Sequence, residues 1–168
     1  MSRPPHILIV EALYYTHIAA HLRKGAERAL EAAGATHEVV SVPGAFEIPA
    51  AVGIAARSSR RFDGFVALGC VIRGETTHYD HICAESARGL QDLAARDGLA
   101  IGYGILTVEN EAQALARASA AERDKGGEAV RACLSLLHLK RRFDGEQNDK
   151  AERAAAPRSA TAGQRVGS

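Results

Sequence analysis

The segment Ala67–Leu90 reads ALGCVIRGETTHYDHICAESARGL, an apolar run followed by a glycine and a cluster of polar residues. The run Gly64–Ile72 is typical of a buried strand, and Gly74 lets the backbone turn tightly after it. The next residues predict a helix start, whose unpaired N–H groups can bind an anion. His78 lies at this start, and histidine titrates near neutral pH. This order of strand, glycine turn and helix predicts an α/β fold with a catalytic or binding site after the strand.

Strand and helix patterns alternate along most of the chain. Short apolar runs predict buried strands, and apolar residues spaced three and four apart predict amphipathic helices. The predicted strands are 6–10, 37–42, 64–72 and 100–108. Five helices are predicted: one contains Ile18, one Ile48 and one Ile82, and the last two cover residues 110–118 and 125–143. Gly34 and Gly98 are expected to end the helices that precede them, and Asn110 is expected to cap the start of the helix that follows it. The repeated order predicts a parallel sheet with helices on both faces.

Composition excludes several classes of protein. The chain has 168 residues, 46% of them hydrophobic, and a net charge of +1, which is typical of one soluble domain. Lys and Arg number 21 against 20 Asp and Glu, and aromatic residues make up 5%, so we expect no nucleic-acid partner. No apolar run has the length of a membrane span and no signal peptide is evident, which predicts no membrane partner and a cytoplasmic location.

The cysteines and the carboxyl-terminal region add two expectations. Cys70, Cys83 and Cys133 lie in apolar segments without a CxxC pair, which favours a reducing compartment over a disulfide framework. From Asp144 onward the composition shifts to Gly, Ala, Ser, Gln and balanced charges. We therefore predict a domain over residues 1–143 and a disordered tail over residues 144–168.

Three polar clusters lie at the carboxyl ends of predicted strands. They are Tyr14–Tyr15, Gly44–Glu47 and Arg73–His78. Parallel α/β sheets bind ligands beyond the carboxyl ends of their strands. The clusters therefore predict one shared pocket.

A metal site is the weaker interpretation of the histidines. His78 and His81 lie near Asp80, and His17 and His21 have the spacing of a helical ligand pair. Zinc sites need three or four converging ligands, and we expect His17 and His21 to line a solvated helix face. We therefore expect no metal.

Two further patterns have alternative interpretations. Cys83 could pair with His78 as a nucleophile, but its position after an apolar residue within a helix favours a buried, inert thiol. The segment Gly74–Thr77 offers N–H donors and two hydroxyls, which suits either a phosphate cradle or an ordinary N-cap. Arg117 and Lys125 are candidate cations for such a phosphate.

Four separated motifs resemble the lumazine synthase family. They are VPGAFEIPAA at 42–51, the segment at 67–90 quoted above, GILTVEN at 104–110 and DKGGEA at 124–129, and the resemblance covers residues 6–143. This family of transferases condenses 5-amino-6-(D-ribitylamino)uracil with 3,4-dihydroxy-2-butanone 4-phosphate to 6,7-dimethyl-8-ribityllumazine in riboflavin biosynthesis. The resemblance implies that activity for this chain, without a metal or organic cofactor.

The resemblance also implies a fold and an assembly. The fold would be a flavodoxin-like three-layer sandwich with a central four-stranded parallel sheet flanked by helices. The chain would form a homopentamer with each active site between neighbouring subunits, and it would have a functional link to riboflavin synthase. The turn at 119–124 lacks the Gly- and Lys-rich pattern of sixty-subunit shells, and only residues 1–5 precede the first strand. We therefore expect free or paired pentamers.

Site roles follow from the resemblance position by position. His78 would transfer protons. The implied substrate-binding residues are Tyr14, Gly44, Ala45, Phe46, Glu47, Cys70, Val71, Ile72, Tyr103 and Lys125. The implied phosphate-binding residues are Glu75, Thr76, Thr77 and Arg117. Tyr103, Lys125 and Arg117 would come from the neighbouring subunit.

The sequence departs from the common family pattern at the pocket edge. Leu13 stands where an arginine often precedes the stacking aromatic residue, Tyr14 is commonly Phe, and Tyr103 is commonly Phe or Asn. A tyrosine keeps the ring and adds a hydroxyl, so we expect stacking to survive while ligand affinities shift. The alternatives to an enzyme are a flavin- or lumazine-binding protein with little turnover and a structural shell protein. His78 and Arg117 favour the enzyme.

Overall fold

The computed structural model describes the backbone of residues 3–155 and the side chains of residues 3–145. The strands are β1 (His6–Ala12), β2 (Thr36–Val42), β3 (Gly64–Ile72) and β4 (Ile101–Val108). The helices are α1 (Thr16–Ala32), the short 3₁₀ helix η1 (Ala45–Glu47), α2 (Ile48–Ala56), α3 (His78–Asp97), α4 (Glu111–Ala118) and α5 (Lys125–Ala155). The four predicted strands are confirmed, with ends that shift by at most two residues.

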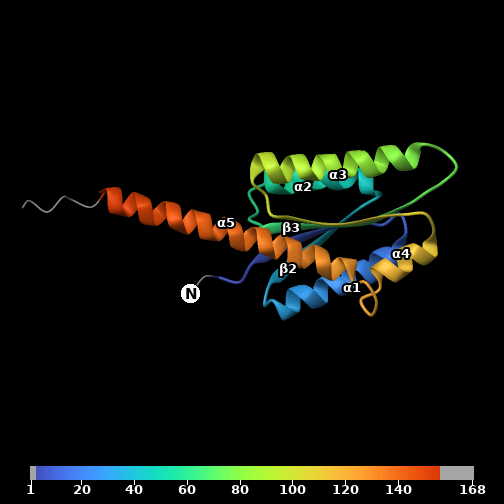
Figure 1. Ribbon diagram of the computed structural model, residues 1–168, viewed down its shortest axis with the longest axis horizontal. Helices are drawn as coiled ribbons and strands as arrows, with labels where there is room; N and C mark the ends of the chain where they lie inside the picture. The colour runs from blue at the N-terminus through green and yellow to red at the C-terminus, as the bar shows by residue number, and fades with distance from the viewer. Residues whose placement is uncertain (1–2, 156–168) are drawn as a thin grey trace, which may run out of the picture.

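The four strands form one parallel sheet in the order β2-β1-β3-β4. Helices α2 and α3 cover one face of the sheet, and α1, α4 and α5 cover the other (Figure 1). The predicted flavodoxin-like three-layer α/β sandwich is confirmed. Within residues 3–155, no helix combines the length and apolar character needed to cross a membrane.

Strand β1 is buried from both sides, which explains its continuous apolar sequence. Ile7 and Ile9 pack in the core between the sheet and helices α1 and α5. Leu8 and Val10 point to the opposite face and pack with α2 and α3. All four side chains are at most 1% exposed, as expected for a central strand of a parallel sheet.

Local signals set the helix ends that flank the sheet. Gly34 and Gly98 follow α1 and α3 with φ angles of +64° and +63°, a left-handed conformation that glycine adopts without strain. The Asn110 side chain accepts a hydrogen bond from the backbone N–H of Gln113 at 2.9 Å and caps α4. These three predicted boundaries are confirmed.

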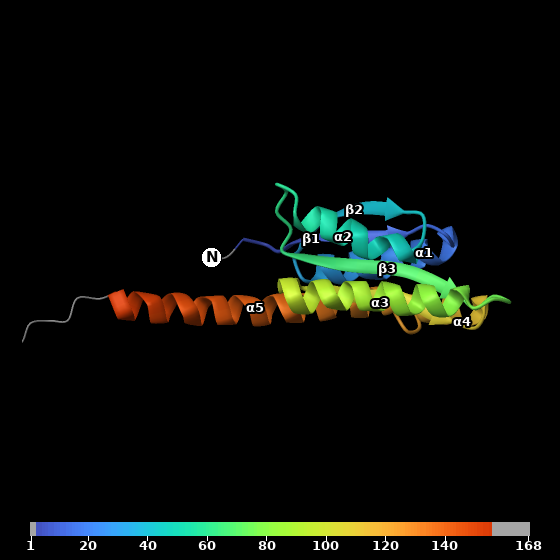
Figure 2. The same ribbon diagram turned by 90° about the horizontal axis from the view of Figure 1, so that it is seen from above.

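Helix α5 is longer than its apolar pattern predicts. It continues to Ala155, so the predicted end at Phe143 is wrong. Residues 144–155 lack apolar periodicity, but Ala, Glu, Gln, Lys and Arg are strong helix formers and no proline occurs before Pro157. Figures 1 and 2 show α5 extending past the other elements on the side of the amino ends of the strands. The division into a domain and a tail at residue 144 stays a prediction, and residues 156–168 lie outside the described residues.

Candidate active site

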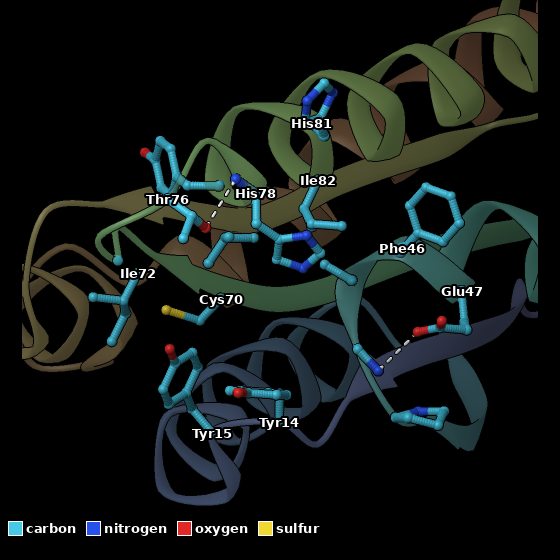
Figure 3. Close-up of a pocket in the computed structure, with 16 residues that line it drawn as sticks. Tyr14, Tyr15, Phe46, Glu47, Cys70, Ile72, Thr76, His78, His81 and Ile82 are labelled. Atoms are coloured by element: carbon cyan, nitrogen blue, oxygen red, sulfur yellow. Dashed lines mark hydrogen bonds between the residues drawn. The ribbon is translucent and has the colours of Figure 1, made fainter.

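A cavity of about 730 Å³ lies beyond the carboxyl ends of the central strands. The three polar clusters predicted to share a pocket all contribute to it, from the β1–α1 loop, the η1 segment and the β3–α3 loop (Figure 3). Its lining consists of Tyr14, Tyr15, Pro43, Gly44, Ala45, Phe46, Glu47, Cys70, Val71, Ile72, Gly74, Thr76, His78, Tyr79, His81 and Ile82. The volume suits a small organic ligand.

His78 is the first residue of α3, and its ring points into the cavity (Figure 3). Its backbone N–H donates to the hydroxyl oxygen of Thr76 at 3.3 Å, which fixes where the helix begins. His81, three residues later, also lines the cavity, but its ring lies on the outer side of α3 and points away from that of His78 (Figure 3). Of these two histidines, His78 is therefore the one placed to exchange protons with a bound ligand.

Two aromatic side chains at the cavity are unusually exposed. Tyr14 is 75% exposed and Phe46 is 55% exposed, although both rings line the cavity. The Tyr14 ring packs edge-on against Tyr15, with ring centroids 4.9 Å apart. Exposed aromatic rings at a cavity offer stacking surfaces to a planar ligand.

Glu47 is held at the cavity by a local hydrogen bond. The backbone N–H of Gly44 donates to its Oε2 atom at 3.0 Å, which closes the single turn of η1. Its Oε1 atom has no hydrogen bond in the part of the chain that the structure describes. Glu47 can therefore accept a hydrogen bond from a ligand hydroxyl.

The end of β3 presents backbone polar groups to the cavity. The pairing of β1 with β3 ends at Glu11 and Leu68, whereas the pairing of β3 with β4 continues to Ile72. One edge of the segment Cys70–Ile72 therefore lacks a strand partner, and this segment lines the cavity. Unpaired backbone N–H and C=O groups can bind the polar edge of a heterocyclic ligand.

The Cys70 thiol and the Tyr15 phenol stay neutral at the cavity floor. Burial raises the pKa of Cys70 to about 12. Burial is also the main cause that raises the pKa of Tyr15, with smaller contributions from Tyr14 and Cys70. Cys70 is therefore a packing residue rather than a nucleophile.

The predicted phosphate cradle is only partly directed at the cavity. Gly74 and Thr76 line it, whereas Glu75 and Thr77 are exposed and do not. The backbone N–H of Asp80 donates to the carbonyl of Thr77 at 3.0 Å, so this loop runs directly into the first turn of α3. That turn provides N–H groups near the cavity.

Besides Glu75 and Thr77, three more predicted site residues do not line the cavity within a single chain. Tyr103 lies on the edge strand β4 and is 43% exposed. Arg117 on α4 donates from Nη1 to the carbonyl of Gln113 at 3.2 Å. Lys125 at the start of α5 pairs with Glu128. Their expected contribution from a neighbouring subunit stays a prediction.

The cavity includes residues to which the sequence analysis assigned no site role. They are Pro43, Tyr79, His81 and Ile82, whereas Tyr15 and Gly74 belong to the polar clusters that were predicted to share the pocket. Ile82 follows His78 by four residues on a helix and shares its face, whereas Tyr79 is the next residue along the chain. Helical spacing from His78 is the signal that places Ile82 at the cavity, although the same spacing is also typical of a core-facing helix stripe.

Neither alternative chemistry gains support from the structure. Within residues 3–145, no three His, Cys, Asp or Glu side chains are grouped closely enough to hold a metal ion. Cys83 is half-buried rather than buried, and burial raises the pKa of its thiol. A raised pKa argues against a reactive thiolate beside His78.

These features define a class of parallel α/β proteins with a cavity of ligand size at the carboxyl ends of the strands. The chain matches the family model of 6,7-dimethyl-8-ribityllumazine synthase over residues 4–141. It is 54% identical over 149 residues to 6,7-dimethyl-8-ribityllumazine synthase 1 of Rhizobium meliloti, covering 86% of this chain and 97% of that protein. It is 58% identical over 138 residues to the Sphingopyxis alaskensis 6,7-dimethyl-8-ribityllumazine synthase, covering 82% and 96%. The chain therefore belongs to the 6,7-dimethyl-8-ribityllumazine synthase family.

Proposed function

We propose that this protein is a transferase that condenses 5-amino-6-(D-ribitylamino)uracil with 3,4-dihydroxy-2-butanone 4-phosphate to 6,7-dimethyl-8-ribityllumazine. The main support is the cavity, which brings a histidine and two exposed aromatic rings together at the carboxyl ends of the strands. Membership of the lumazine synthase family gives the reaction to which these groups are suited.

The pyrimidine and its ribityl chain would occupy the side of the cavity formed by Tyr14, Phe46 and Glu47. The two exposed rings provide stacking surfaces for a planar pyrimidine. The free Oε1 atom of Glu47 can accept a hydrogen bond from a ribityl hydroxyl. The unpaired edge of Cys70–Ile72 can donate to and accept from the pyrimidine edge.

His78 would transfer protons during the reaction. The amine attacks the ketone, water leaves to form an imine, phosphate is eliminated, and an enol tautomerises before the ring closes. Each step moves a proton near neutral pH, and a positioned histidine can both accept and donate it. Such general acid–base catalysis contributes about 10²-fold or more.

The phosphate group would bind at the start of α3. The Thr76 hydroxyl and N–H groups of the loop and first turn other than those of His78 and Asp80 can donate to phosphate oxygens, and the helix dipole favours an anion there. Arg117 from a neighbouring subunit would supply the cation, with Glu75 and Thr77 beside it. Tyr103 and Lys125 of the same neighbour would close the pocket.

This arrangement requires a homo-oligomer, and we propose a homopentamer. The proposed steps involve proton transfer, loss of water and loss of phosphate, so side chains and backbone groups suffice without a cofactor. A cytoplasmic location and a functional link to riboflavin synthase belong to the same proposal.

The test is formation of the lumazine product from the two named substrates, followed spectroscopically at concentrations that suppress the uncatalysed condensation. The proposal expects turnover by the purified oligomer and a large loss with Arg117→Ala. A folded oligomer that binds lumazine but gives no turnover would support a flavin- or lumazine-binding protein instead. Light scattering of the same sample separates a pentamer from a large shell.

A further inference from the structure

Arg73 joins the start of α3 to the loop before α4 through three contacts of one guanidinium group. Its Nε atom lies 2.9 Å from Oε2 of Glu109, and its Nη1 atom lies 3.4 Å from Oδ1 of Asp80. The guanidinium carbon lies 4.2 Å from the centroid of the Tyr79 ring. A planar guanidinium can donate within its plane and stack through its face, whereas a lysine ammonium cannot do both.

These contacts hold together the two ends of the loop that precedes His78. Arg73 is the first residue after β3, and its backbone N–H donates to the carbonyl of Val108 in β4 at 3.0 Å. The loop 74–77 starts at the next residue, and the two α3 contacts of Arg73 directly follow His78. The loop itself is exposed, and a Cβ atom at Gly74 would meet nothing within 4 Å. The side chain of Arg73 therefore connects the two ends of an otherwise exposed loop. We call its contacts with Glu109, Asp80 and Tyr79 the clasp.

Glu109, one of the residues that Arg73 contacts, is hydrogen-bonded to α4. The backbone N–H of Glu109 donates to Oε1 of Gln113 at 3.0 Å, and Asn110 caps the same helix. Helix α4 carries Arg117. The clasp therefore links the loop before His78 to the helix whose Arg117 would serve the site of a neighbouring subunit.

The value of these contacts for global stability is small. The side chain of Arg73 is 42% exposed, and those of Asp80 and Glu109 are exposed further. Ion pairs this exposed contribute little to the free energy of folding. The consequence that we expect is therefore local, namely the orientation of the loop and of His78.

We propose that Arg73 is a positioning residue that holds the 74–77 loop and His78 in a fixed orientation to α4. Its kinetic consequences rest on the proposed function. Loss of the clasp lowers kcat, because His78 moves, and raises the KM for the butanone phosphate, because its binding loop moves. The KM for the ribitylaminouracil stays unchanged, because Tyr14 and Phe46 lie on elements that Arg73 does not contact.

The first experiment compares Arg73→Met with Arg88→Met. Arg88 is a matched control, because it also lies on the surface and pairs with two carboxylates, Glu85 and Asp92, but farther along α3. We expect Arg73→Met to lower kcat by about tenfold and to leave the ribitylaminouracil KM within about twofold, since misplacement of a catalytic group by about 1 Å can cost 10²-fold. Arg73→Lys should recover little of this loss, and Arg88→Met should behave as the parent. Parental kinetics for Arg73→Met, or an equal rise in both KM values, would overturn the proposal.

A double-mutant comparison tests whether Arg73 acts through His78. Adding Arg73→Met to His78→Ala should cause almost no further loss of kcat, because the group that it positions is already gone. A full additional tenfold loss would contradict this role. Glu109→Gln should likewise reproduce part of the Arg73→Met effect, and the two together should not be additive.

A measurement without turnover separates this proposal from the proposed function. Hydrogen exchange reports the backbone amides of His78 and Asp80, which bond to Thr76 and Thr77 in the clasped loop. They should exchange several-fold faster in Arg73→Met than in Arg88→Met. Unchanged exchange would overturn the clasp even in an active enzyme, whereas faster exchange in a protein without turnover would retain the clasp and reject the proposed reaction.

Discussion

Gly126 of α5 lies against the backbone carbonyl of Leu22 in α1, and a Cβ atom at Gly126 would stand 2.0 Å from that oxygen. Gly126→Ala should therefore force α5 away from α1 and lower the free energy of unfolding by about 1–3 kcal/mol, the usual cost of overpacking. Gly145→Ala is the control in the same helix, because a Cβ atom there meets nothing within 4 Å. Urea denaturation should show a loss for the first variant and none for the second. Equal stabilities would contradict the close approach.

The cap of α4 should be measurable in the same way. Asn110→Ala removes the acceptor for the Gln113 N–H and should cost about 1 kcal/mol of stability, whereas Asn110→Asp keeps an acceptor and should cost much less. Because α4 carries Arg117, Asn110→Ala should also raise the KM for the butanone phosphate. Equal midpoints for the Ala and Asp variants in urea would show that the cap does not stabilise the helix.

Cys133 should make stability depend on pH in the alkaline range. Burial raises the pKa of its thiol from 9.0 to about 12. Between pH 9 and about 12 the unfolded chain loses this proton while the folded chain keeps it, so stability falls as pH rises, by about 1.4 kcal/mol per pH unit. Cys133→Ala removes that dependence but adds a constant packing cost. The parent's advantage over the variant should therefore shrink by roughly 1 kcal/mol between pH 8 and pH 10 in urea titrations. A constant difference would contradict the buried, neutral thiol.

Tyr14 should contribute to binding through its ring rather than its hydroxyl. Tyr14→Phe keeps the stacking surface and should leave the dissociation constant of the lumazine product within about twofold, whereas Tyr14→Ala should weaken binding by roughly tenfold. Fluorescence titration of the product measures both. Weaker binding by the Phe variant would instead assign the contribution to a hydrogen bond of the hydroxyl.

Apolar periodicity was sufficient to predict the sheet and most helices of this chain. Strand β3 was predicted with its observed ends because its run from Gly64 to Ile72 is continuous, and the start of α4 follows from Asn110. The end of α5 could not be predicted from periodicity, since residues 144–155 are helical without an apolar stripe. The helix propensity of these residues favours a helix. The shift in composition after Phe143 indicates a disordered tail instead, and the prediction followed the composition.

The site was predictable where it depends on strand ends and not where it depends on side-chain packing. The gathering of Tyr14, Glu47 and His78 follows from the parallel topology alone. The stacking of Arg73 on Tyr79 depends on rotamers that no sequence pattern specifies. The placement of Arg117 depends on assembly and stays a prediction.

The most direct test of the central claim is the initial rate of lumazine formation by the parent protein, His78→Gln and His81→Gln in one assay. The ring of His78 points into the cavity and that of His81 lies on the outer side of α3, so the two substitutions are matched in chemistry and differ in position (Figure 3). We predict turnover by the parent, a loss of about 10²-fold in kcat for His78→Gln, and a change of less than about twofold for His81→Gln. Equal losses in the two variants, or no product from a folded parent oligomer, would contradict the assignment of this cavity and of His78 to lumazine synthesis.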